Sequence, residues 1–170
     1  RTAFVISQKV PIVEVFAVNP DRRGFSRPKL KTRLDLREFD RFGFTPFQKT
    51  TPDGREIWFS HKLADAVSVR ATNGAYRGLD FLALGDRARP NHLEFVENDR
   101  GKVAYITLAR IDDRRDGRVA SSQVAIVDRS VAPGKRRIIG TFFTHGREAH
   151  GLWTNPEHTR LYIAHEQDEL

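Results

Sequence analysis

Histidine is the residue type in this chain best suited to binding a metal or an anion. Two of the six histidines, His92 and His150, occupy equivalent positions in two copies of a repeated segment. Neutral imidazole is the commonest metal ligand in proteins, so both residues are candidate metal ligands. Glu94 follows His92 by two residues, which places both side chains on one face of an extended strand. Its carboxylate could ligate the same metal or orient the imidazole.

A structural role for these two histidines is the alternative interpretation. In that role they pack at the start of a strand and hydrogen-bond to the neighbouring backbone. Metal sites need three or four convergent ligands, and Pro46 takes the equivalent position in the remaining copy of the segment. The sequence therefore leaves metal binding at His92 and His150 as one of two interpretations.

Sequence motifs of several common enzyme classes are absent. The chain has no dinucleotide-binding glycine motif, phosphate loop, nucleophile elbow or His-Glu-x-x-His motif. It has no cysteine, which excludes disulfides, zinc–thiolate sites and a thiol nucleophile. We therefore assign no catalytic residue from the sequence.

The charge composition is basic but well mixed. The chain has 29 Lys and Arg against 22 Asp and Glu, a net charge of +7, which favours acidic partners such as nucleic acid or anionic lipid. Acidic residues interleave with most of the basic ones, whereas a nucleic-acid surface requires clustering. We therefore do not expect a nucleic-acid partner. No apolar stretch reaches the roughly 20 residues of a membrane-spanning helix, so we expect no membrane span.

The segment that carries the two histidines occurs three times, at residues 44–60, 91–107 and 149–164. Each copy consists of an alternating strand, a turn rich in Pro, Asn, Asp and Gly, a charged residue, and an apolar strand centred on an aromatic. Such self-similarity indicates a repeat architecture. The expected strands span 2–8, 11–18, 29–36, 44–50, 56–61, 66–71, 77–84, 91–97, 102–109, 122–128, 135–143, 149–154 and 160–165.

The spacing of the central aromatics gives the length of the repeat. Trp58 and Tyr105 are 47 residues apart, and Tyr105 and Tyr162 are 57 apart, so a ten-residue insertion is assigned to 109–118. Four antiparallel strands per repeat of this length are typical of a β-propeller blade. We expect the three aromatics to be largely buried between blades.

The fold class predicted is therefore all-β, a propeller of four-stranded antiparallel blades with about three blades present. Closed propellers have about 4–8 blades, so we expect a single incomplete domain whose remaining blades come from residues outside 1–170 or from another chain. The predicted units are a partial blade 1–38, a blade 42–85, a blade 89–144 and a partial blade 147–170.

Propeller geometry predicts where the histidines gather. The first residues of the inner strands rim one mouth of the central channel, which places His92 and His150 there. Loops between the second and third strands emerge on the same face, so the 109–121 segment should protrude beside them. His158 alone is expected on the opposite face. The further candidates for the ligand face are His61, His145 and His165.

Several segments resemble the YVTN-repeat propellers, whose blades carry a Ser-Pro-Asp-Gly-Lys turn, a Leu-Tyr-Val strand and a Val-x-Val-Ile-Asp strand. Relatives of that family include the propellers of nitrous oxide reductase and cytochrome cd1. The matching segments are 52–60, 123–128 and 155–164, and 147–153 resembles the Pro-His-Gly entry of the inner strand in many members.

This resemblance implies a ring of seven blades, and a periplasmic or secreted protein. It also implies a binding or scaffolding module that holds an unknown protein or small ligand at the channel mouth. The alternative it leaves open is a metal- or haem-dependent redox enzyme or electron-transfer propeller. Copper or haem would be the cofactor in that case, as in the relatives where channel-facing histidines hold copper.

Overall fold

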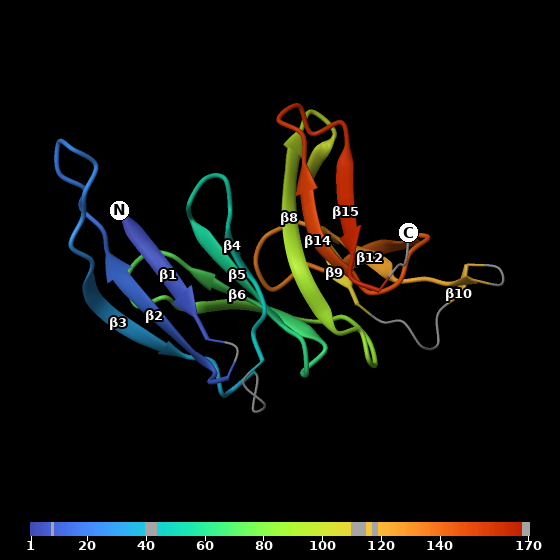
Figure 1. The fold of residues 1–170 in the computed structure, drawn as a ribbon, viewed down its shortest axis with the longest axis horizontal. Coiled ribbons are helices and arrows are strands. Elements are labelled where there is room, and N and C mark those ends of the chain that lie inside the picture. The colour runs from blue at the N-terminus through green and yellow to red at the C-terminus, as the bar shows by residue number, and fades with distance from the viewer. Residues whose placement is uncertain (8, 40–43, 110–114, 117–118, 168–170) are drawn as a thin grey trace.

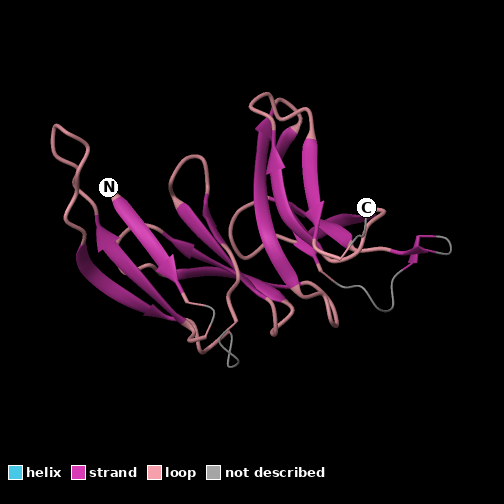
Figure 2. Cartoon of the chain, viewed as in Figure 1, coloured by secondary structure: helices cyan, strands magenta, loops and turns pink. Residues whose placement is uncertain are grey.

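The computed structural model describes residues 1–7, 9–39, 44–109, 115–116 and 119–167. Within these ranges the chain forms strands and loops and no helix (Figure 2). The strands build successive antiparallel sheets, with the N-terminal sheet at one end of the molecule in Figure 1. The described residues contain no helix long and apolar enough to cross a membrane. The prediction of an all-β propeller with four-stranded antiparallel blades is confirmed.

The first two sheets cover the N-terminal half of the chain. The first has three strands, and its edge strand pairs with the middle one along its whole length. The second is a complete four-stranded blade in chain order. Their strands are β1 (Thr2–Ile6), β2 (Ile12–Ala17), β3 (Lys29–Asp35), β4 (Gln48–Thr50), β5 (Glu56–His61), β6 (Ala66–Ala71) and β7 (Gly78–Ala83).

The next two sheets complete the described chain. The third is a four-stranded blade in the order β8-β9-β12-β13, and the fourth is the pair β14-β15. A short hairpin, β10-β11, extends from the third blade (Figure 1). The bounds are β8 (Pro90–Asn98), β9 (Gly101–Leu108), β10 (Arg115–Asp116), β11 (Val119–Ala120), β12 (Gln123–Asp128), β13 (Ile138–Phe143), β14 (Ala149–Thr154) and β15 (Leu161–His165).

Most strand boundaries agree with the sequence prediction to within a few residues, and β4 is the main exception. It begins at Gln48 rather than at residue 44. Pro46 has no N–H to donate, so the segment before it cannot form a continuous ladder. Isolated bonds remain there, as Lys62 N–H donates to the carbonyl of Phe44 at 3.0 Å. The prediction for 109–121 falls mostly outside the described residues.

The core lies between the blades, and β5 contributes to it from both faces. Because side chains alternate along a strand, Ile57 and Phe59 pack against the first sheet, whereas Trp58 packs against the third. The Trp58 ring meets Phe95 of β8 edge to face, with centroids 5.5 Å apart. The repeated aromatic position is therefore the place where neighbouring blades interlock.

A buried arginine joins the second and third blades beside this aromatic pair. Arg136 lies before β13, and its guanidinium contacts Asp80 of β7 at 2.9 Å and Glu56 of β5 at 2.6 Å. The same group lies over the Trp58 ring, 5.5 Å from its centroid. The ion pairs satisfy charges that would otherwise be costly to bury between two sheets.

The expected burial of the three repeated aromatics is only partly correct. Trp58 is fully buried, Tyr105 is half-buried, and Tyr162 is 42% exposed. The degree of burial of each aromatic depends on how much of a neighbouring sheet packs against it. The third blade packs against Trp58, β14 contacts β9, which carries Tyr105, and no described strand follows β15, which carries Tyr162. The position is an inter-blade one, and it is buried only where the next blade is present.

Candidate functional site

The inner strands of three blades lie next to one another, since β8 contacts both β4 and β14. This packing brings His92 of β8 and His150 of β14 together, with ring centroids 5.1 Å apart and planes tilted by 48°. Equivalent positions in two repeats thus meet in space. The two imidazoles form the nucleus of the candidate site.

Both histidines lie in β-bulges. In β8, Pro90 pairs with Leu108 and Leu93 with Ile106, so Asn91 and His92 together face Thr107 alone. In β14, Ala149 pairs with His165 and Leu152 with Ile163, so His150 and Gly151 together face one residue of β15. Bulges interrupt regular pairing and turn side chains away from the ladder, and they are frequent beside functional sites.

The ring of His92 is held between an aromatic side chain and the second imidazole. Phe47, which immediately precedes β4, stacks on it with centroids 4.0 Å apart and planes inclined by 18°. Burial is the main cause that lowers the pKa of His92 to about 4, and the charges of His150 and Lys49 add to it. The carboxylate of Glu94 acts in the opposite direction. At neutral pH the His92 ring is therefore uncharged.

This depressed pKa predicts that His92 makes folding pH-dependent. The unfolded chain takes up a proton at His92 near the ordinary pKa of 6.5, whereas the folded chain does so only near 4. Protonation therefore favours the unfolded state, and the contribution of His92 to stability is complete above pH 6.5 and lost as the pH falls toward 4. Denaturation midpoints at pH 7 and about 4.5 should show a smaller acid loss for His92→Gln than for the wild type. Equal losses in the two proteins would contradict the shifted pKa.

His150 has a carboxylate partner. Its Nε2 lies 3.2 Å from Oε1 of Glu166, which follows β15. Both side chains remain partly accessible, with exposed fractions of 34% for His150 and 49% for Glu166. A carboxylate at this distance orients the imidazole ring. The pair has the geometry of a base and the group that orients it.

Glu94 forms an ion pair with a lysine, whereas the sequence suggested a metal or the His92 imidazole as its partner. Its Oε1 lies 2.6 Å from Nζ of Lys49 in β4 and also accepts the N–H of Phe95 at 2.9 Å. The carboxylate is almost fully buried, so its charge is compensated by the lysine rather than by water. The ion pair links the inner strands β4 and β8 beside the His92 ring.

The remaining predicted histidines have hydrogen-bond partners of their own. His61 is fully buried, with Nε2 at 2.7 Å from the hydroxyl of Ser68 and Nδ1 at 3.4 Å from that of Thr45. His165 Nε2 lies 2.9 Å from the Thr144 hydroxyl, and the backbone N–H of His145 donates to Ser121 at 3.0 Å. Across the described residues, no group of three or more His, Asp or Glu side chains is placed to hold a metal ion.

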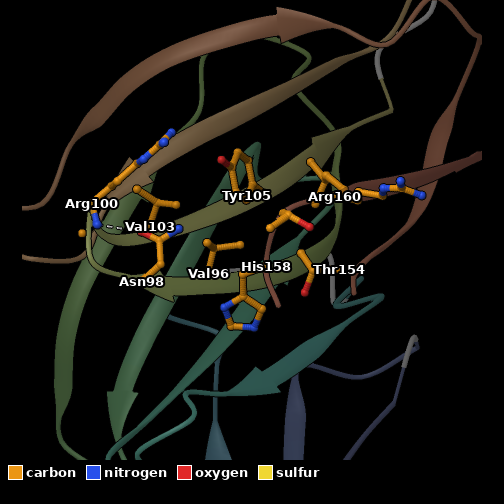
Figure 3. A pocket seen from close by; sticks show the side chains of 11 residues that line it. Val96, Asn98, Arg100, Val103, Tyr105, Thr154, His158 and Arg160 are labelled. Atoms are coloured by element: carbon orange, nitrogen blue, oxygen red, sulfur yellow. Dashed lines mark hydrogen bonds between the residues drawn. The ribbon is translucent and has the colours of Figure 1, made fainter. Parts of the chain in front are cut away.

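A cleft of about 320 Å³ lies at the ends of β8 and β14 opposite to His92 and His150, on the side where the sequence placed His158 alone of the histidines. It is bounded by the β8–β9 and β14–β15 turns (Figure 3). His158 lines it, and its Nδ1 lies 3.2 Å from the backbone nitrogen and 3.1 Å from the carbonyl oxygen of Glu97. Arg100 and Arg160 lie on opposite sides of the cleft in Figure 3 and do not converge. The cleft therefore has volume, but its two arginines do not point to a common position.

Comparison with known proteins identifies the architecture. No family model and no curated protein matches this chain. A protein of Bacteroides uniformis ATCC 8492, described as a "putative 6-phosphogluconolactonase", superposes with a TM-score of 0.69 and 16% identity over 95% of this chain and 43% of its own. A protein of Bacteroides fragilis NCTC 9343 with the same description gives a TM-score of 0.49, at 17% identity, over 84% of this chain and 38% of its own. The likeness shows the fold alone.

These findings correct two predictions made from the sequence. No family model supports membership of the YVTN-repeat family, and the structure that this chain resembles with a TM-score of 0.69 is described as a "putative 6-phosphogluconolactonase" instead. The description of the Bacteroides uniformis protein also contradicts the expected binding or scaffolding module and its alternative, a metal- or haem-dependent redox propeller. The motif misled because a Pro-Asp-Gly turn followed by an apolar strand is what any antiparallel blade requires. Export to the periplasm stays a prediction.

The sequence did not identify three residues of the site, namely Phe47, Lys49 and Glu166. Pro46 was the residue aligned with His92, yet its neighbour Phe47 is the one that contacts the imidazole. A bulge adds one residue to a strand and so shifts which side chain faces a neighbour. An aromatic beside the aligned position was the available signal for Phe47, and a carboxylate next to His165 was the signal for Glu166.

Proposed function

We propose that this chain forms part of a propeller that hydrolyses a sugar-derived lactone at the channel mouth where His92 and His150 meet. The observation that carries the proposal is the pairing of His150 with Glu166 beside an uncharged His92. The likeness in fold to a protein described as a "putative 6-phosphogluconolactonase" supports the class of substrate. The chain spans 43% of that protein's length, and we propose that further blades complete the ring and the site.

His150 is the general base in this proposal. The oxygen of a water molecule attacks the carbonyl carbon of the lactone while Nδ1 of His150 takes the water proton. Glu166 holds Nε2 and stabilises the imidazolium that forms. The bond between the carbonyl carbon and the ring oxygen then breaks, and the ring oxygen leaves as a hydroxyl with the proton returned from His150. The product is the open hydroxy acid.

His92 stabilises the charge that develops on the carbonyl oxygen. A neutral imidazole carries one N–H, which can donate to that oxygen as it becomes negative. The low pKa keeps the ring neutral over the whole range in which a histidine base functions. Phe47 fixes the plane of the ring by stacking, and an oriented donor needs no reorganisation during the reaction.

Ring opening by the full-length protein tests this function. D-Glucono-1,5-lactone and its 6-phosphate are the probes, and the appearance of the hydroxy acid is followed by proton NMR against the spontaneous rate. We expect the protein to accelerate the opening of at least one of them. Opening of both probes at the spontaneous rate, by protein whose fold is verified, would overturn the proposal.

A further inference from the structure

We propose that Thr107 is the positioning residue that holds His92 and His150 at their mutual spacing. It lies on β9, is fully buried, and has no access to a substrate. Its role would be to connect the inner strands of two blades at the point where each strand departs from regular pairing. The inference rests on the proposed function only for its kinetic readout.

The register of β8 and β9 explains why a hydroxyl is needed at this point. Asn91 and His92 share Thr107 as their single opposite residue, so the ladder cannot satisfy every backbone group of the bulge. The hydroxyl of Thr107 supplies the missing acceptor, taking the N–H of His92 at 2.9 Å. The backbone of the first histidine is thereby fixed by a side chain on the neighbouring strand.

The same hydroxyl also reaches the second blade. It donates to the carbonyl of His150 at 3.0 Å, whereas its distance to the carbonyl of His92 is 3.4 Å. A hydroxyl has one donor and two acceptor sites, so both bonds can exist together. His150 lies in the bulge of β14, and no β14–β15 ladder pair fixes it directly. One atom therefore bridges the backbones of both histidines, which belong to different sheets.

Valine has nearly the shape of threonine and lacks the hydroxyl, so Thr107→Val separates the hydrogen bonds from the packing. The full-length variant should show altered imidazole signals of His92 and His150 in nitrogen–proton correlation spectra. It should also show kcat for lactone opening reduced by roughly 10- to 100-fold with little change in KM, because displacement of a reacting group by about 1 Å is this costly. Thr107→Ser, which keeps the hydroxyl, should restore both.

Thr51→Val is the matched control. Thr51 is also buried, and its hydroxyl accepts the N–H of Glu56 at 3.1 Å in the β4–β5 turn, away from the histidines. It should lose stability as Thr107→Val does and leave the imidazole spectra and kcat unchanged. If Thr107→Val does not fold, the pair Thr107→Ser and Thr107→Ala isolates the same hydroxyl.

Two results would overturn the positioning role. One is an imidazole spectrum of Thr107→Val that is the same as the spectrum of Thr51→Val. The other is a Thr107→Ser variant as impaired as Thr107→Val. The spectra decide the matter even if the wild-type protein opens no lactone, so failure of this inference and failure of the proposed function remain distinguishable.

Discussion

Replacement of His150 with glutamine is expected to reduce lactone opening by the full-length protein by about 10²- to 10⁴-fold, the usual contribution of a general base. Glutamine keeps a polar group of similar reach but accepts no proton at neutral pH. The loss should appear in kcat, because the base acts on water in the transition state rather than on substrate binding. Steady-state kinetics on the lactone probes measure it.

Two further variants make this prediction specific. Glu166→Gln keeps the contact to His150 Nε2 without the charge, and it should lower kcat by less than the loss of the base itself. His158→Gln alters a histidine that lines the cleft at the other end of the strands, so it should leave kcat unchanged. If His150→Gln retains full activity while His158→Gln abolishes it, the base has been assigned to the wrong end of the molecule.

The largest effect on stability is expected for Trp58→Ala, at about 3–5 kcal/mol in the free energy of unfolding. The ring is fully buried between two complete blades, contacts Phe95, and donates its Nε1–H to Glu56 at 3.1 Å. Its removal leaves a cavity. It also removes the ring over which the buried Arg136 guanidinium lies. Equilibrium denaturation of the full-length protein measures the loss.

Tyr162→Ala is the companion variant, because it removes an aromatic from the same repeat position in β15. With 42% of the residue exposed in this chain, its loss should cost roughly 1 kcal/mol or less if that face remains uncovered. A cost as large as that of Trp58→Ala would mean that a further blade covers Tyr162 in the full-length protein. A cost for Trp58→Ala below about 1 kcal/mol would contradict the inter-blade core itself.

The sequence predicts the blades well because the signals for them are local. Turns such as 52–54 require Pro, Asp and Gly at set positions, and the strands that flank them alternate in the pattern of a sheet. Repetition of this pattern identifies the propeller without any contact information. The exposed Tyr162 could not be predicted, since burial depends on the neighbouring blade rather than on the residue.

The site is only partly predictable, for a physical reason. Repeat equivalence correctly singled out His92 and His150 as neighbours, because equivalent positions on the adjacent strands β8 and β14 lie side by side. The partners of these histidines depend on two bulges, and a single added residue decides whether Pro46 or Phe47 faces the imidazole. The chemistry of the site was not predictable from turn motifs, since these report a shape shared by unrelated propellers.

The central claim is that the His92–His150 mouth is the binding site, and a crystal structure of the full-length protein with an aldonate product bound tests it most directly. The account predicts that the ligand lies beside His92 and His150, with its carboxylate near the position assigned to the attacked carbonyl. The cleft beside His158 and Arg160 is the competing location, since it offers a volume of about 320 Å³. Product bound in that cleft, with the histidine pair empty, would contradict the account.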